Sequence, residues 1–210
     1  MRLIHRRLAI AFAVLALAAC SKGGGGGGAV PSDMTMGPDT AKVTVVEYAS
    51  VACPVCAEFN QEVFPAFKKK YVDTGKVKYV MREALTGNPN LAASGFLLAR
   101  CAGKDKYFAV TDAVFRAQSE MYEPGTENIR PDAARDVLMR IGREAGMSES
   151  QVTQCLSDEK AITALNDRVE KNSTDSHLDG TPMFVVNGKK LKTGATSLAE
   201  LDAAIQPLLK

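Results

Sequence analysis

Apolar residues change their spacing along the chain, and the first part of the pattern indicates two strands around a helix. Residues 43–50 and 77–81 are rich in β-branched residues, as is typical of strands. Between them, residues 54–72 carry apolar side chains at helical spacing, with Pro65 inside the stretch to kink the helix. This order of elements predicts a βαβ unit, in which the two strands lie parallel.

The middle of the chain, about residues 88–175, has the spacing of helices instead. Its apolar residues recur at intervals of three and four: Tyr107, Val110, Val114 and Ala117, then Ala134, Val137, Leu138 and Ile141, then Ile162, Leu165 and Val169. Ser148 and Gln151 form a capping box, so a further helix begins there and carries Cys155 on its apolar face. We therefore expect a block of helices inserted between the strands.

After the helical block the pattern returns to strands at residues 183–187 and 189–191. Asn187 and Gly188 join them as a tight hairpin, which makes the two strands antiparallel. A capping box at Ser197 begins a last helix. The residues that this helix is expected to bury are Leu198, Leu201, Ile205 and Leu208.

The N-terminus has the pattern of an export signal. Arginines at positions 2, 6 and 7 precede an apolar run, residues 8–19, that is too short to span a bilayer as a mature helix. The run ends in Leu17-Ala18-Ala19-Cys20, which resembles the lipobox of bacterial lipoproteins, so we expect cleavage before Cys20 and lipidation of its sulfur. The alternative is ordinary cleavage at the Ala-x-Ala pattern, which leaves a soluble periplasmic protein. Both interpretations place the domain outside the cytosol.

These features divide the chain into a signal peptide (1–19), a tether (20–40) and a folded domain (41–210). Six consecutive glycines, residues 23–28, cannot pack into a core and make the tether flexible. The formal charge of the whole chain is +2, but the signal peptide carries three of its basic residues and none of its acids. Without the signal peptide, 23 basic residues face 24 acidic ones, a net charge of −1. No concentrated basic face remains, so nucleic acid is not an expected partner.

Cys53-Pro54-Val55-Cys56 follows the first strand directly and begins the first helix. Unpaired backbone N–H groups at a helix N-terminus, together with the helix dipole, stabilise a thiolate over a thiol. The position therefore makes Cys53 a nucleophile at neutral pH. Pro54 suits the first helical turn because it has no N–H group to leave unpaired.

The same two cysteines have other interpretations, which are half of a zinc site or a purely structural disulfide. A zinc site needs two more ligands, and the chain outside the signal peptide offers only Cys101, Cys155 and His177, none at a zinc-finger spacing. We therefore predict no metal site. In an oxidising compartment Cys101 and Cys155 form an even pair, which predicts a structural disulfide, with two buried free thiols as the alternative.

The combination of a C-P-x-C motif after a strand, an inserted helical block and Gly180-Thr181-Pro182 before the returning strand resembles the DsbA family. The resemblance implies an α/β, thioredoxin-like fold with an inserted α-helical domain at about 88–175. It also implies that Pro182 is a cis proline facing the catalytic cysteines, and that the backbone of Thr181 binds a peptide strand.

Two further expectations come with the resemblance. Glu47, six residues before Cys53, matches a buried acid that relays a proton near Cys56, and the alternative is an exposed strand residue. A second, non-catalytic disulfide in the helical insertion, as found in some DsbA-like proteins, agrees with the pairing of Cys101 with Cys155.

The function implied by the resemblance is a periplasmic, membrane-anchored thiol:disulfide oxidoreductase without a cofactor. It would pass the Cys53–Cys56 disulfide to exported cysteine-containing proteins, and a DsbB-like membrane quinone oxidoreductase would restore that disulfide. Many strong oxidants of the family carry histidine where Val55 stands, so we expect a weaker oxidant. Two alternatives stay open: a reductase or isomerase for clients such as apocytochrome c, and a metallochaperone whose two thiolates hold Cu(I).

Overall fold

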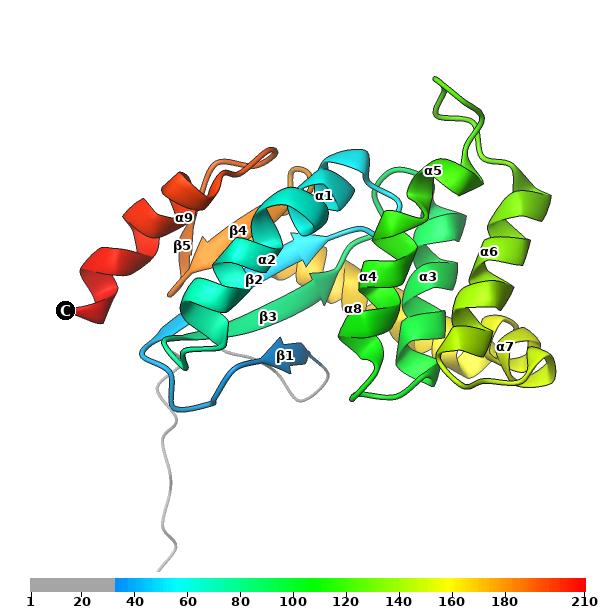
Figure 1. Cartoon of the computed structure of the whole chain (residues 1–210), viewed down its shortest axis with the longest axis horizontal. Coiled ribbons are helices and arrows are strands. Elements are labelled where there is room, and N and C mark those ends of the chain that lie inside the picture. The colour runs from blue at the N-terminus through cyan, green and yellow to red at the C-terminus, as the bar shows by residue number, and fades with distance from the viewer. Residues whose placement is uncertain (1–32) are drawn as a thin grey trace, which may run out of the picture.

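The computed structural model describes residues 33–210, and its centre is a mixed sheet of five strands in the order β1-β3-β2-β4-β5 (Figure 1). The strands are β1 (Met34–Met36), β2 (Val43–Ala49), β3 (Val77–Glu83), β4 (Met183–Val186) and β5 (Lys189–Lys190). β2 and β3 are parallel, whereas the other three pairs of neighbours are antiparallel. The predicted βαβ unit and the predicted hairpin are both confirmed, with Asn187 and Gly188 at positive φ in the turn.

A single helical stretch connects β2 to β3, as predicted. It consists of α1 (Pro54–Glu58), a π-helical turn η1 (Phe59–Val63), α2 (Phe64–Phe67) and a second π-helical turn η2 (Lys68–Val72). The first π-turn stands directly before the turn that contains Pro65. Because proline has no N–H to donate to the helical ladder, a widened turn at this point is its expected consequence.

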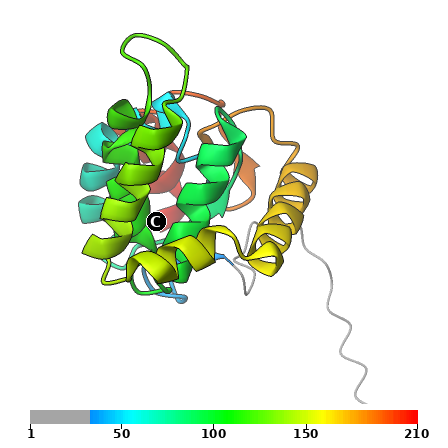
Figure 2. The same ribbon diagram turned by 90° about the vertical axis from the view of Figure 1, so that its right-hand side faces the viewer.

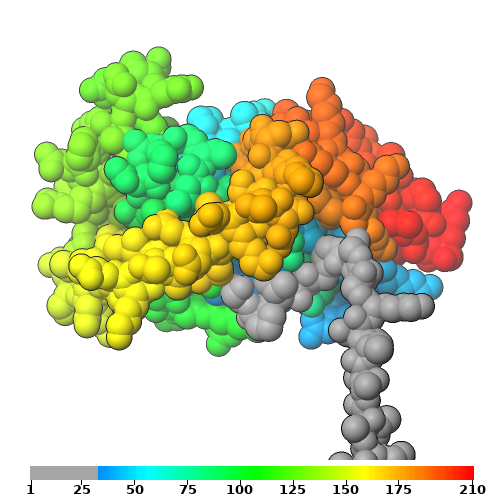
Figure 3. Space-filling model, turned by 180° about the vertical axis from the view of Figure 1, so that it is seen from behind, coloured from blue at the N-terminus to red at the C-terminus, as the bar shows by residue number. Residues whose placement is uncertain are grey.

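The helical block occupies one end of the molecule (Figure 1), the end that faces the viewer in Figure 2. It comprises α3 (Pro89–Cys101), α4 (Tyr107–Arg116), α5 (Gln118–Met121), α6 (Pro131–Glu144), α7 (Glu149–Leu156) and α8 (Glu159–Ser176). The first and last of these helices agree closely with the predicted insertion at about 88–175. α8 packs against β3 on the face of the sheet opposite α1 and α2, and the chain continues from α8 to β4 (Figure 3).

A buried carboxylate joins the helical block to the sheet. Glu83, the last residue of β3, is 2% exposed and accepts hydrogen bonds from Arg100 of α3 (Nε–Oε1, 2.5 Å) and Arg168 of α8 (Nε–Oε2, 3.2 Å). Tyr107 of α4 donates to the same carboxylate through its hydroxyl, at 3.1 Å. One side chain at the end of a central strand therefore fixes three helices of the insertion.

Two expectations need correction. The tether was expected to reach residue 40, but residues 34–36 form β1, an edge strand whose three residues are too few to give a periodic signal. Leu208 was expected to be buried with the last helix, and its side chain is 41% exposed. α9 (Leu198–Ile205) ends before Pro207, and the chain continues as a 3₁₀ turn, which rotates Leu208 away from the core.

Candidate functional site

Cys53 stands at the N-cap of α1, where the chain turns from β2 into the helix. Its backbone is extended (φ −91°, ψ 121°) and Pro54 fills the first helical position, so the N–H groups of Val55 and Cys56 are free to point at the sulfur of Cys53. The residue is 8% exposed, and Cys56, one turn further on, is completely buried. Only the first of the two sulfurs is accessible to a partner. The two cysteines are free thiols in this structure.

The loop before β4 brings Thr181 and Pro182 against Cys53. The Thr181–Pro182 peptide bond is cis, and the Cys53 thiol lies 3.5 Å from the carbonyl oxygen of Thr181. These residues are 128 positions apart in the chain. The antiparallel pairing of β2 with β4 brings them together, because the loop after β2 and the loop before β4 lie at the same end of these two strands.

Opposite changes in pKa distinguish the two cysteines. A hydrogen bond from Cys56, assisted by the Thr181 hydroxyl and by the N–H groups at the start of α1, lowers the pKa of Cys53 to about 6. Burial raises the pKa of Cys56 well above its usual value, and the neighbouring sulfur of Cys53 raises it further. At neutral pH the pair therefore consists of a thiolate at Cys53 and a protonated thiol at Cys56.

This difference predicts the pH dependence of alkylation. Only the thiolate reacts with iodoacetamide, so the rate at Cys53 should rise with pH through a midpoint near 6 and level off above it. Cys56 should stay unmodified at neutral pH. Peptide-resolved mass spectrometry of the reduced protein, alkylated between pH 4 and pH 9, measures both rates. A midpoint for Cys53 near that of an ordinary cysteine, about 8.5, would contradict the assignment.

Glu47 lies in the middle of β2 and is 2% exposed, so the alternative of an exposed strand residue is wrong. Its carboxylate accepts a hydrogen bond from the hydroxyl of Tyr79 at 2.5 Å. Burial raises the pKa of Glu47 to about 7, against the lowering effect of that hydrogen bond. The charge of Glu47 in turn contributes to the raised pKa of Cys56. Its role as a proton relay stays a prediction.

Two residues of the helical block hold the turn that carries Cys53, and sequence reasoning missed both. The amide nitrogen of Gln118 donates to the carbonyl oxygens of Val51 at 2.7 Å and Cys53 at 3.1 Å. Tyr122 donates from its hydroxyl to the carbonyl of Ala52 at 3.2 Å. A lone glutamine or tyrosine carries no such signal in a sequence, because the contact depends on how the block packs against α1.

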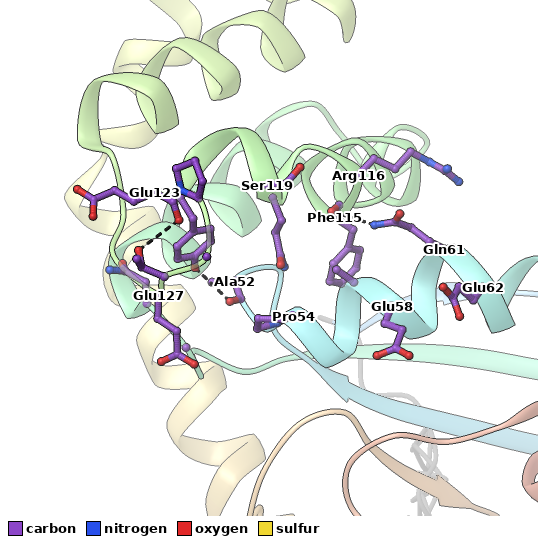
Figure 4. A pocket seen from close by; sticks show the side chains of 18 of the residues that line it. Ala52, Pro54, Glu58, Gln61, Glu62, Phe115, Arg116, Ser119, Glu123 and Glu127 are labelled. Atoms are coloured by element: carbon purple, nitrogen blue, oxygen red, sulfur yellow. Dashed lines mark hydrogen bonds between the residues drawn. The ribbon is translucent and has the colours of Figure 1, made fainter.

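A cleft of about 710 Å³ opens beside Cys53, between α1 and the helical block (Figure 4). Ala52 and Pro54, the two neighbours of Cys53, belong to its lining, as do Gln118 and Tyr122. Its acidic lining residues are Glu58, Glu62, Glu123 and Glu127. The guanidinium of Arg116, also in the lining, is paired with Asp112 at 2.8 Å. The cleft reaches the reactive turn through Ala52 and Pro54.

The remaining predicted site residues lie away from this cleft or beyond the described chain. Cys101 and Cys155 form a disulfide between the end of α3 and α7, with a Cα–Cα distance of 6.3 Å, so neither is available as a zinc ligand. Within residues 33–210 no group of three or more His, Cys, Asp or Glu side chains is arranged to hold a metal ion. Cys20 and the signal peptide fall outside those residues. Among the described helices, none is both long and apolar enough to cross a bilayer.

Comparison with known proteins gives consistent relatives. The "Putative protein-disulfide oxidoreductase" of Rickettsia conorii is 33% identical over 179 residues, which cover 85% of this chain and 61% of that protein. The chain thus spans less than two thirds of the length of this relative. Disulfide bond formation protein D of Bacillus subtilis is 25% identical over 178 residues, covering 83% of this chain and 76% of that protein.

Solved structures agree on the architecture. Alpha-DsbA1 of Wolbachia pipientis matches with a TM-score of 0.75 at 24% identity, over 86% of this chain and 92% of its own. BdbD of Bacillus subtilis matches with a TM-score of 0.69 at 22% identity, over 84% and 92%. A family model described as thioredoxin matches residues 29–207, from before β1 into the 3₁₀ turn after α9. The chain therefore belongs to the thioredoxin family, and its fold is the thioredoxin-like fold of the DsbA proteins with an inserted α-helical domain.

Proposed function

We propose that this protein is a thiol:disulfide oxidoreductase that donates the Cys53–Cys56 disulfide to exported proteins. The observation that carries the proposal is the position of the Cys53 sulfur, which is held as a thiolate against the cis-Pro182 loop at the edge of a cleft of about 710 Å³. The names of the rickettsial and bacillary relatives, both of which refer to disulfide chemistry, support the same activity.

The geometry determines the order of the proposed exchange. A substrate thiolate attacks the accessible sulfur of Cys53 in the oxidised protein, the Cys53–Cys56 bond breaks, and the electron pair leaves on Cys56. A second substrate thiolate then attacks the substrate sulfur of the mixed disulfide and releases Cys53 as a thiolate. Two electrons pass from the substrate to the protein. Cys53 is the better leaving group of the pair because its thiolate is the more stable.

The leaving sulfur of Cys56 needs a proton, because its raised pKa makes the buried thiolate unstable. We assign Glu47 as the proton donor, since it is buried, interacts electrostatically with both cysteines, and burial brings its pKa to about 7. Reoxidation reverses this step, with Glu47 accepting the proton.

The location and partners of the protein are part of the same proposal, which the sequence supports. The export signal and Leu17-Ala18-Ala19-Cys20 support a lipoprotein on the periplasmic side of a bacterial membrane, with its domain on a glycine-rich tether. The substrates are then cysteine-containing proteins that have just been exported. A DsbB-like quinone oxidoreductase in the membrane would reoxidise the Cys53–Cys56 pair.

The reduction potential of the Cys53–Cys56 pair decides the direction of electron flow. We expect a value between about −150 and −120 mV in a glutathione titration of residues 20–210 with Cys20→Ser, because Val55 adds no charge to stabilise the thiolate further. The oxidised protein should also convert one equivalent of a reduced dithiol peptide to its disulfide. A potential near −270 mV would make the protein a reductase instead. If no Cys53–Cys56 disulfide forms at any potential, the redox function itself is wrong.

A further inference from the structure

A residue that none of the motifs includes lies next to the site. Thr86 belongs to the loop between β3 and α3, and its hydroxyl oxygen is 2.5 Å from the hydroxyl oxygen of Thr181. Thr181 in turn contacts Cys53: its carbonyl oxygen lies 3.5 Å from the Cys53 sulfur, and its hydroxyl is among the groups that lower the pKa of Cys53. Contacts through Thr181 therefore connect Thr86, just before the helical block, with the reacting sulfur.

The loop that carries Thr86 is held firmly against the reactive turn. Ser50, completely buried at the end of β2, donates from its hydroxyl to the carbonyl oxygen of Thr86 at 2.8 Å and accepts from the N–H of Ala52 at 3.3 Å. The next residue, Gly87, has a φ of +75°, and a Cβ there would lie 2.6 Å from the carbonyl oxygen of Ala52. A side chain at position 87 would push the loop away, so the close approach that places Thr86 depends on glycine.

The geometry points to Thr86 as a positioning residue that directs the hydroxyl proton of Thr181 at the Cys53 sulfur. A threonine hydroxyl has one proton to donate and two lone pairs. If the Thr86 hydroxyl donates its proton to the hydroxyl oxygen of Thr181, the Thr181 hydroxyl does not donate to Thr86. The Thr181 proton is then available for a hydrogen bond to the Cys53 thiolate. Without Thr86, the Thr181 hydroxyl is free to rotate and donate elsewhere. The inference rests on the proposed function only in taking Cys53 as the reacting cysteine.

Several other groups influence the ionisation of Cys53, and replacing Thr86 leaves them in place. Cys56 hydrogen-bonds to the sulfur from within α1. Glu47 of β2 and Tyr122 of the helical block interact with it electrostatically. Thr86 carries no charge, so replacing it changes only the hydrogen bonding of Thr181. If replacing Thr86 changes the ionisation of Cys53 only when the Thr181 hydroxyl is present, the hydrogen bond between the two threonines is therefore the cause.

The test is the pH midpoint of Cys53 alkylation in a double-mutant cycle of Thr86→Val and Thr181→Val. We expect each single variant to raise the midpoint by about 0.5 to 1 pH unit, the size expected for one lost hydrogen bond to a thiolate. The double variant should match Thr181→Val alone, because Thr86 acts through that hydroxyl. Thr86→Ser, which keeps the hydroxyl, should leave the midpoint where the natural protein has it. Alkylation needs no substrate, so the test is independent of the direction of electron flow.

Thr111→Val is the matched control, since Thr111 is 1% exposed and donates only to the carbonyl of Phe108 in α4. It should leave the midpoint unchanged. The inference is overturned if Thr86→Val leaves the midpoint unchanged, or if it raises the midpoint equally with and without the Thr181 hydroxyl. Should Thr86→Val fail to fold, Thr86→Ala replaces it in the same cycle, and the comparison with Thr86→Ser decides.

Discussion

Replacing Cys53 by serine should reduce the oxidation of a dithiol peptide to the uncatalysed rate. The variant cannot form the internal disulfide, and a serine hydroxyl has no thiolate form to attack or to be attacked in exchange. Stopped-flow fluorescence of a labelled dithiol peptide, mixed with the oxidised protein, measures the rate. Full activity in Cys53→Ser would rule out the proposed exchange at this sulfur.

Cys56→Ser is the informative partner of this variant. It keeps the accessible Cys53 but lacks the thiol that could expel a client from Cys53 by re-forming the internal disulfide. Mixed disulfides made when the Cys53 thiolate attacks a client disulfide should therefore accumulate on Cys53. Non-reducing gel electrophoresis followed by mass spectrometry detects and identifies them. If the mixed disulfides formed instead on Cys53→Ser through Cys56, the assignment of the two cysteines would be reversed. The complete burial of Cys56 argues against that outcome.

The elements that the sequence predicted well are those whose signals are local. Residues 43–50 and 183–187 are recognisable from a few neighbours, and Asn187-Gly188 fixes the hairpin by its own backbone preferences. β1 gave no signal because three residues that pair only with β3 depend on a partner far away in the chain. Leu208 was misplaced because periodicity alone does not register that Pro207 ends the helix one turn earlier.

The residues of the site likewise fall into those that the sequence predicted and those that only the packing of the fold places there. Cys53 and Cys56 are visible as a motif, and Thr181 and Pro182 follow from the family resemblance. Gln118 and Tyr122 were not predicted, because they reach the turn at residues 51–53 only through the packing of the helical block against that turn. Thr86 was missed for a similar reason, since its contact with Thr181 joins loops 95 residues apart. Sequence reasoning thus found the reacting atoms but not the residues that position them.

Removing the second disulfide is the change with the largest expected effect on stability. Cys101 and Cys155 are 54 residues apart, and closing a loop of that length removes denatured-state entropy worth about 4 kcal/mol in the chain-entropy model. We therefore expect Cys101→Ala/Cys155→Ala to lower the free energy of unfolding by roughly that amount. Guanidinium denaturation measures it best in a Cys53→Ala/Cys56→Ala background, in which the second disulfide is the only one within residues 33–210. Adding a reductant should then destabilise the protein that retains Cys101 and Cys155 and leave the variant that lacks them unchanged.

The loop closed by the second disulfide contains residues of the site, but we expect the disulfide to stabilise the fold without affecting Cys53. Residues 102–154 contain α4, α5 and α6, and therefore Gln118 and Tyr122, which form one wall of the cleft and hold the Cys53 turn. While the variant stays folded, those contacts persist, so the midpoint of Cys53 alkylation should not move when Cys101 and Cys155 are replaced. A loss of stability below about 1 kcal/mol would show that the disulfide adds little to the packing of α3 against α7. A shifted midpoint would show instead that the bridge acts on the reactive turn through the helical block.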